Sequence, residues 1–136
     1  MALASNFALI VGDSPVTIGD GRLTWEKKFE TPGRAGNRNV IIMFNVRGLV
    51  VATTSVEVKI NDKVVGKLAP YACPDGQDWI FAKNWYTQTI ALDGADLNDG
   101  TNEIQINAVT YPKTTPTDVF DDFAVKDVSC FYHVNV

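Results

Sequence analysis

Metal-binding residues and long apolar runs are scarce in this chain of 136 residues, which has one histidine and two cysteines. The cysteines lie far apart in the sequence and match none of the spacings that bind zinc. No stretch approaches the ~20 apolar residues that a helix needs to cross a bilayer. The sequence therefore argues against a zinc site and against a membrane-spanning helix.

Positive charge is also in short supply, because 12 Lys and Arg face 16 Asp and Glu, for a net charge of −4. Nucleic acids and anionic membrane surfaces both bind to basic protein surfaces. The composition therefore argues against both as partners. It leaves a neutral ligand such as a saccharide open.

The N-terminal segment, residues 1–13, has neither the positive charge nor the long apolar stretch of a secretory signal. We therefore expect a cytoplasmic protein unless a leader has been trimmed off. In a cytoplasmic protein Cys73 and Cys130 stay reduced, whereas in a secreted form a single disulfide between them is the alternative.

Groups that catalyse hydrolysis are poorly represented as well. The single histidine, His133, lies near the end of the chain, and no Gly-x-Ser-x-Gly sequence is present to carry a nucleophile. We therefore interpret His133 as a surface or half-buried structural residue, and we do not predict an enzyme.

Aspartates occur close together in two segments of the chain. These segments contain Asp75, Asp78, Asp118, Asp121 and Asp122. Two carboxylates at a suitable separation can hydrolyse a glycosidic bond, but nothing in the sequence marks one of them as an acid with a raised pKa. Catalysis therefore remains a third interpretation. No Asp-x-Asp-x-Asp loop is present, so no cofactor is predicted, with a structural calcium ion as the lesser alternative.

What the sequence does contain is hydrophobic alternation with a period of two, while no sustained helical period is present. The expected strands are 7–11, 23–29, 39–46, 56–60, 63–68, 86–92, 102–108 and 123–136. Turn sequences rich in Gly, Asp, Asn and Pro separate them. The sequence therefore predicts one all-β domain over residues 1–136, an antiparallel β-sandwich of the jelly-roll kind with about eight or nine strands.

Several local features are also expected. Strand 39–46 is apolar on both faces, as a central strand covered on both sides should be. Asn61 and Asp62 suit a two-residue hairpin turn with positive φ, and a change of phase near Lys126 indicates a β-bulge. Residues 94–100 suit one helical turn at most. Trp25 alternates with Leu23 and Phe29, which places it in the core.

Residues 56–110 carry a motif of a strand, a short Asn-containing turn, "Val-Gly", "Leu-Asp" and "Gly-x-Asn-x-Ile". Its residues are Ile60, Asn61, Val65, Gly66, Leu92, Asp93, Leu97, Gly100, Asn102 and Ile104. This motif resembles that of the galactose-binding-like jelly-roll superfamily, which includes the sugar-binding domain of family 2 glycoside hydrolases and many carbohydrate-binding modules. The resemblance implies the fold and carries over no sugar-binding residues, because superfamily members place their sites on different loops.

Aromatic residues are concentrated in the longest connection, residues 69–85. They are Tyr71, Trp79, Phe81 and Trp85, with Tyr86 directly after. Long loops in compact domains are usually functional or disordered, and this one is too apolar to be disordered. The alternative is that the loop plugs the open end of the sandwich, which we expect for Phe81 and for one tryptophan.

The order of antiparallel strands predicts where the loops lie. Loops 48–53, 69–84 and 111–122 are expected at one end of the sandwich, and turns 61–62 and 93–102 at the other. The two longest loops then share one end, as they do in many sandwich proteins that bind ligands.

We therefore predict a non-catalytic, lectin-like carbohydrate-binding module, with a saccharide as the partner. The predicted ligand-binding residues are Tyr71, Asp75, Asp78, Trp79, Trp85 and Tyr111. The alternative is a structural subunit of a virus particle, phage tail or similar assembly, in which the aromatic loop forms a subunit contact. A homo-oligomer is compatible with both, because small lectins also oligomerise for avidity.

Overall fold

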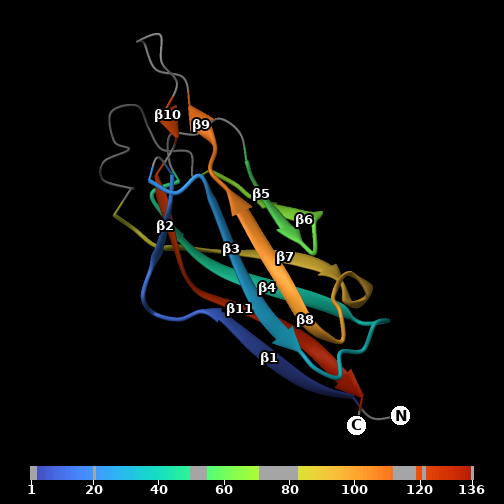
Figure 1. Ribbon diagram of the computed structural model, residues 1–136. Coiled ribbons are helices and arrows are strands. Elements are labelled where there is room, and N and C mark those ends of the chain that lie inside the picture. The colour runs from blue at the N-terminus through green and yellow to red at the C-terminus, as the bar shows by residue number, and fades with distance from the viewer. Residues whose placement is uncertain are drawn as a thin grey trace.

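The computed structural model describes residues 3–19, 21–49, 55–70, 83–111, 119–120 and 122–135, and for residues 110–111 and 119–120 it describes the backbone alone. In these ranges nine strands form two antiparallel sheets, which pack as a sandwich (Figure 1). The predicted all-β architecture and strand number are confirmed. The described part of the chain contains no helix with the length and hydrophobicity of a membrane span.

The first sheet has five strands. Their order is β1 (Leu3–Val11), β11 (Phe123–Asn135), β4 (Asn39–Arg47) and β7 (Tyr86–Asp93), with the short β2 (Val16–Ile18) also paired to β11. The first and last strands lie side by side, since Leu3 pairs with Asn135, and this pairing brings the two ends of the chain together (Figure 1).

The second sheet has four strands. Their order is β3 (Thr24–Thr31), β8 (Gly100–Asn107), β5 (Val56–Ile60) and β6 (Lys63–Leu68). A separate two-stranded ladder joins β9 (Thr110–Tyr111) to β10 (Val119–Phe120), and the short 3-10 turn η1 (Gly94–Asp96) follows β7. That turn confirms the expectation of one helical turn at most after residue 93.

The core lies between the two sheets. Along the strands, every second residue faces inward, and these side chains fill the core from both sides. Ile42 and Phe44 of β4 meet Ile104 and Ile106 of β8 in one buried cluster. Trp25 belongs to the same cluster, as predicted. Leu23 was expected to share its face, but it lies before the first residue of β3 and is 50% exposed.

Strand β4 is central in its sheet, but the expectation that it is covered on both faces is wrong. Its inward residues are buried, whereas Ile41 on the outward face is 48% exposed. Phe7 and Phe131 also project from this outer face, and their ring centroids lie 6.1 Å apart. The second apolar face of the strand therefore belongs to an exposed apolar patch.

The predicted irregularities in the strands are present. Asn61 and Asp62 have φ values of 51° and 67°, which are the left-handed conformations that a two-residue hairpin turn requires. Asp127 has a φ of 48°, and the pairing of β11 with β4 shifts register between Lys126 and Ser129. Both the hairpin turn and the β-bulge were readable from the sequence because each depends on local backbone chemistry.

A buried asparagine explains why the "Gly-x-Asn-x-Ile" motif is present. The side chain of Asn102 is 1% exposed. Its Oδ1 accepts hydrogen bonds from Asn61 Nδ2 at 3.0 Å and from the Asn98 backbone N–H at 2.7 Å, and its Nδ2 donates to Thr31 Oγ1 at 2.8 Å. One amide thus joins the hairpin turn to the segment after η1 and to β3.

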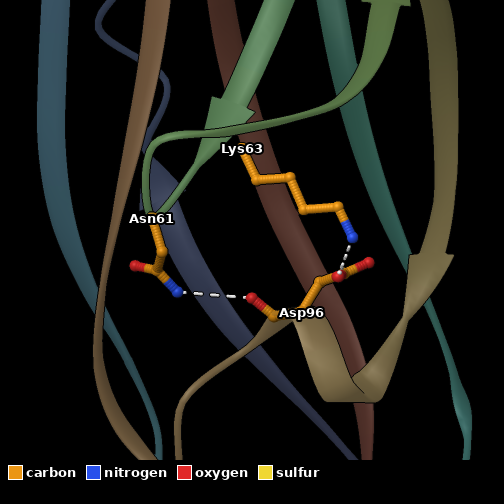
Figure 2. A network of polar contacts seen from close by, with 3 residues as sticks. All are labelled: Asn61, Lys63 and Asp96. Atoms are coloured by element: carbon orange, nitrogen blue, oxygen red, sulfur yellow. Dashed lines mark hydrogen bonds and ion pairs between the residues drawn. The ribbon is translucent and has the colours of Figure 1, made fainter.

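Figure 2 shows how the same hairpin turn is tied to η1. Asn61 Nδ2 also donates to the Asp96 carbonyl at 3.3 Å, and Lys63 Nζ forms an ion pair with Asp96 Oδ1 at 2.7 Å. That hydrogen bond with Asp96 raises the pKa of the Lys63 ammonium. The motif residues therefore close this end of the sandwich with structural contacts, and we call it the closed end.

Candidate functional site

The end of the sandwich opposite the closed end contains a pocket of about 340 Å³. It is lined by Val46, Gly48, Leu49, Ala69, Pro70, Tyr86, Thr87 and Gln88. These residues come from the end of β4, the end of β6 and the start of β7, so both sheets contribute to the pocket. We call this end the loop end.

One side chain joins the two sheets at the pocket. Gln88 Nε2 donates to the Ala69 carbonyl at 2.8 Å, and Gln88 Oε1 accepts from the Ala69 backbone N–H at 2.8 Å. The Gln88 side-chain amide thus makes, with the backbone of Ala69, the two hydrogen bonds that a neighbouring strand would make just after the end of β6. This double contact fixes one wall of the pocket.

The start of β11 reaches the same end. Gly48 has a φ of 89°, and a Cβ at this position would lie 2.9 Å from the Asp122 carbonyl oxygen. A glycine is therefore needed where the chain leaves β4 and passes close to Asp122. Pro70 and Asp122, which border the two long predicted loops, consequently both lie at the loop end.

Most of the predicted ligand-binding residues fall within those loops. Tyr71, Asp75, Asp78 and Trp79 lie outside the described residues, and Tyr111 is described only as backbone at the end of β9. Their assignment to a saccharide site stays a prediction. Trp85 is the one predicted ligand-binding residue whose side chain the structure describes.

Trp85 is half-buried and lies directly before β7, in line with the exposed Thr87 on the outer face of the five-stranded sheet. The guanidinium carbon of Arg47 lies 4.6 Å from the centroid of its ring, and Lys126 Nζ lies 4.4 Å from it. Both distances are within the range of cation–π attraction. The tryptophan was predicted from the sequence as a ligand-binding residue, whereas the two cations were not.

Next to this group, polar side chains link the three adjacent strands. Thr87 Oγ1 donates to Asn45 Oδ1 at 2.7 Å, and Asn45 Nδ2 donates to Asp127 Oδ2 at 3.4 Å. The outer surface beside Trp85 therefore carries hydroxyl, amide and carboxylate groups in addition to the two cations. Such groups are suited to hydrogen bonding with a polar ligand.

Three other side chains with titratable groups, Cys130, Tyr132 and His133, lie on β11. Cys130 is a free cysteine in the core, and burial raises the pKa of its thiol to about 12, so it stays protonated at neutral pH and is not a nucleophile. His133 is half-buried, as predicted. Burial also raises the pKa of Tyr132.

Candidate metal ligands were sought in the same described ranges. No group of three or more His, Cys, Asp or Glu side chains is placed there to hold a metal ion. Four of the five aspartates considered for catalysis, Asp75, Asp78, Asp118 and Asp121, lie outside the described residues, and the fifth, Asp122, is exposed.

Comparison with known proteins defines the class of fold. No known protein family matches the sequence, and no curated protein matches it either. Among solved structures, the chain is similar to a β-porphyranase of glycoside hydrolase family 86 from the human gut bacterium Bacteroides plebeius, with a TM-score of 0.56 and 15% identity. The match covers 98% of this chain but only 21% of the porphyranase.

Two further matches are carbohydrate-binding modules of family 35. One is from Clostridium thermocellum, with a TM-score of 0.45, 13% identity and coverage of 95% of this chain and 90% of that module. The other is from Paenibacillus barcinonensis, with a TM-score of 0.35, 17% identity and coverage of 91% of each chain. The two antiparallel sheets and the match to the porphyranase domain show the sandwich fold that the sequence predicts.

Proposed function

We propose that the protein is a non-catalytic carbohydrate-binding module whose site lies at the loop end. The observation that carries the proposal is the pocket of about 340 Å³, with half-buried Trp85 one residue before its wall. Ligand pockets commonly have volumes of ~300–1,000 Å³ and combine apolar walls with a few polar groups. Here Val46 and Leu49 supply apolar surface, and Thr87 supplies a hydroxyl.

A saccharide suits this combination because a sugar ring has an apolar face and a polar rim. The apolar face packs against aromatic or aliphatic surface, while the hydroxyls bind amide, hydroxyl and carboxylate groups. In the proposal the predicted residues Tyr71, Asp75, Asp78, Trp79 and Tyr111 complete the rim around the pocket.

The similarity to the porphyranase supports the proposal in one respect. This chain spans about a fifth of that glycoside hydrolase, 21% of its length. A module of that size fits a domain that binds a polysaccharide rather than a complete hydrolase. The protonated thiol of Cys130 fits a non-catalytic role as well.

Affinity electrophoresis through gels that contain single polysaccharides, followed by calorimetric titration of any that retard the protein, tests the proposal. We expect at least one polysaccharide to retard the native protein, and Trp85→Ala to weaken that binding tenfold or more, since about 1.4 kcal/mol corresponds to a tenfold change. Phe7→Ala is the matched control, because Phe7 is an exposed aromatic residue on β1, away from the pocket lining. Failure of every saccharide to bind would contradict the proposal.

A second candidate function, an assembly subunit, is favoured by the apolar patch on the outer face of the five-stranded sheet. Phe7 is 59% exposed and Leu9 is 58% exposed, and Phe131 and Ile41 extend the same face. Large exposed apolar patches often mark protein contacts. Under this interpretation the native protein sediments as a large oligomer, Phe7→Ala disrupts it, and no polysaccharide retards the protein.

A further inference from the structure

Two cations share one aromatic ring at the loop end. The ring of Trp85 has the Arg47 guanidinium carbon at 4.6 Å and Lys126 Nζ at 4.4 Å from its centroid. The two positive charges therefore lie within about 9 Å of each other, close enough to repel. From this arrangement we infer that the site binds acidic saccharides, those that carry carboxylate or sulfate groups, in preference to neutral ones.

The fold brings this group together from three adjacent strands. Arg47 ends β4, Lys126 belongs to β11, and Trp85 precedes β7, while the strand order places β4 between the other two. Lys126 pairs with Asn45 just before the bulge at Asp127. Because a bulge alters the direction of neighbouring side chains, this irregularity sets where the Lys126 ammonium lies.

Arg47 and Lys126 are basic residues in a protein that is acidic overall. The ion pair found among the described residues, Lys63 with Asp96, lies at the closed end. In a protein of net charge −4, these two residues bring two positive charges to one aromatic ring. An anionic group bound there relieves their mutual repulsion.

The chemistry of the two side chains suits a sugar acid. A guanidinium binds a carboxylate or a sulfate through two parallel hydrogen bonds, and an ammonium adds a point charge. Both residues are half-buried, and a charge that is less exposed to water interacts more strongly with an anion. The indole attracts both cations and so keeps them close to one another.

This inference rests on the proposed function, and matched pairs of polysaccharides test it separately. The first pair is polygalacturonate with highly methyl-esterified pectin, and the second is carrageenan with chemically desulfated carrageenan. The members of each pair differ chiefly in charge, by carboxylates in the first and by sulfates in the second. We expect the charged member of one pair to bind at least tenfold more tightly than the neutral member. Which pair shows this preference tells whether the site binds carboxylates or sulfates. We also expect the preference to fall as salt is added.

Substitutions locate the preference. Arg47→Gln and Lys126→Gln are each expected to reduce this preference to threefold or less. Arg47→Lys retains the positive charge and is expected to keep most of the preference for the charged polysaccharide. Lys28→Gln is the matched control, since Lys28 is an exposed lysine on β3 of the other sheet. Asp127→Asn, at a φ of 48° that asparagine accepts, removes a nearby negative charge and should increase the preference.

The outcomes separate the inference from the function on which it rests. Equal affinity for the charged and neutral members overturns the inference and leaves the saccharide function standing. If the preference for the charged polysaccharide remains in both Arg47→Gln and Lys126→Gln, the anion binds elsewhere, and the inference is also overturned. If no polysaccharide binds at all, the proposed function fails, and the inference fails with it.

Discussion

Replacing Asn102 with alanine is expected to lower the free energy of unfolding by about 3 kcal/mol, because it removes a buried hydrogen-bonding group from the closed end. The Asn98 backbone N–H would lose the acceptor that now lies 2.7 Å away. Thr31 Oγ1 would lose the donor at 2.8 Å, and Asn61 Nδ2 would keep only the Asp96 carbonyl. Water cannot easily reach these groups, since the Asn102 side chain is 1% exposed.

Chemical denaturation of the variant measures this effect, with Asn107→Ala as the control on the same strand. Asn107 Oδ1 accepts from Thr24 Oγ1 and Gln105 Nε2, and it lies nearer the surface. Its replacement should cost less than about 1 kcal/mol, as surface substitutions usually do. Equal losses in the two variants would show that the buried network does not hold the closed end.

Gly94→Ala is expected to destabilise the protein by a similar amount, about 3 kcal/mol, because the new methyl group would clash with backbone atoms. A Cβ on Gly94 would overlap the Ala35 carbonyl oxygen and would lie 2.6 Å from that of Arg38. These are backbone atoms, and Arg38 already accepts a hydrogen bond from the Gly94 N–H at 2.8 Å. Relief therefore requires the start of η1 to move away from the segment before β4.

Thermal unfolding of Gly94→Ala, compared with Gly12→Ala, tests this expectation. A Cβ on Gly12 would meet nothing within 4 Å, and so that variant should unfold within a few degrees of the native protein. A Gly94→Ala variant as stable as Gly12→Ala would mean that the close approach at η1 is not a constraint.

The sequence predicted those parts of the fold that depend on local chemistry. Asn61 and Asp62 tolerate positive φ, and the phase change at Lys126 is visible in the pattern of apolar residues, so the hairpin turn and the bulge were both identified. The strands followed from alternation in the same way. The exposure of Ile41 was predicted wrongly, because the sequence pattern of an apolar residue is the same whether neighbouring segments cover it or leave it exposed.

The candidate site was less accessible to sequence reasoning because it depends on pairing between distant strands. Arg47 and Lys126 are unremarkable in their own segments, and only the order of β11, β4 and β7 brings them to Trp85. Trp85 itself was found because aromatic residues are concentrated in its loop. The pocket was likewise hidden, since Ala69 and Gln88 meet across the two sheets.

The two ends of the sandwich thus have different properties. At the closed end two residues of the sequence motif, Asn61 and Asn102, are hydrogen-bonded to each other, and Asn61 also bonds to the Asp96 carbonyl. At the loop end the described residues form an open pocket beside an indole with two cations. A motif that identifies the fold therefore need not contain the residues that we propose for binding.

Backbone amide chemical shifts, followed by NMR while a bound saccharide is titrated in, most directly test whether the loop end is the binding site. Our account predicts that the largest shifts occur at residues 45–49, 69–70 and 85–88, with Lys126 among those affected. Shifts concentrated instead at the hairpin turn 61–62 and at η1 would place the saccharide at the closed end and contradict it.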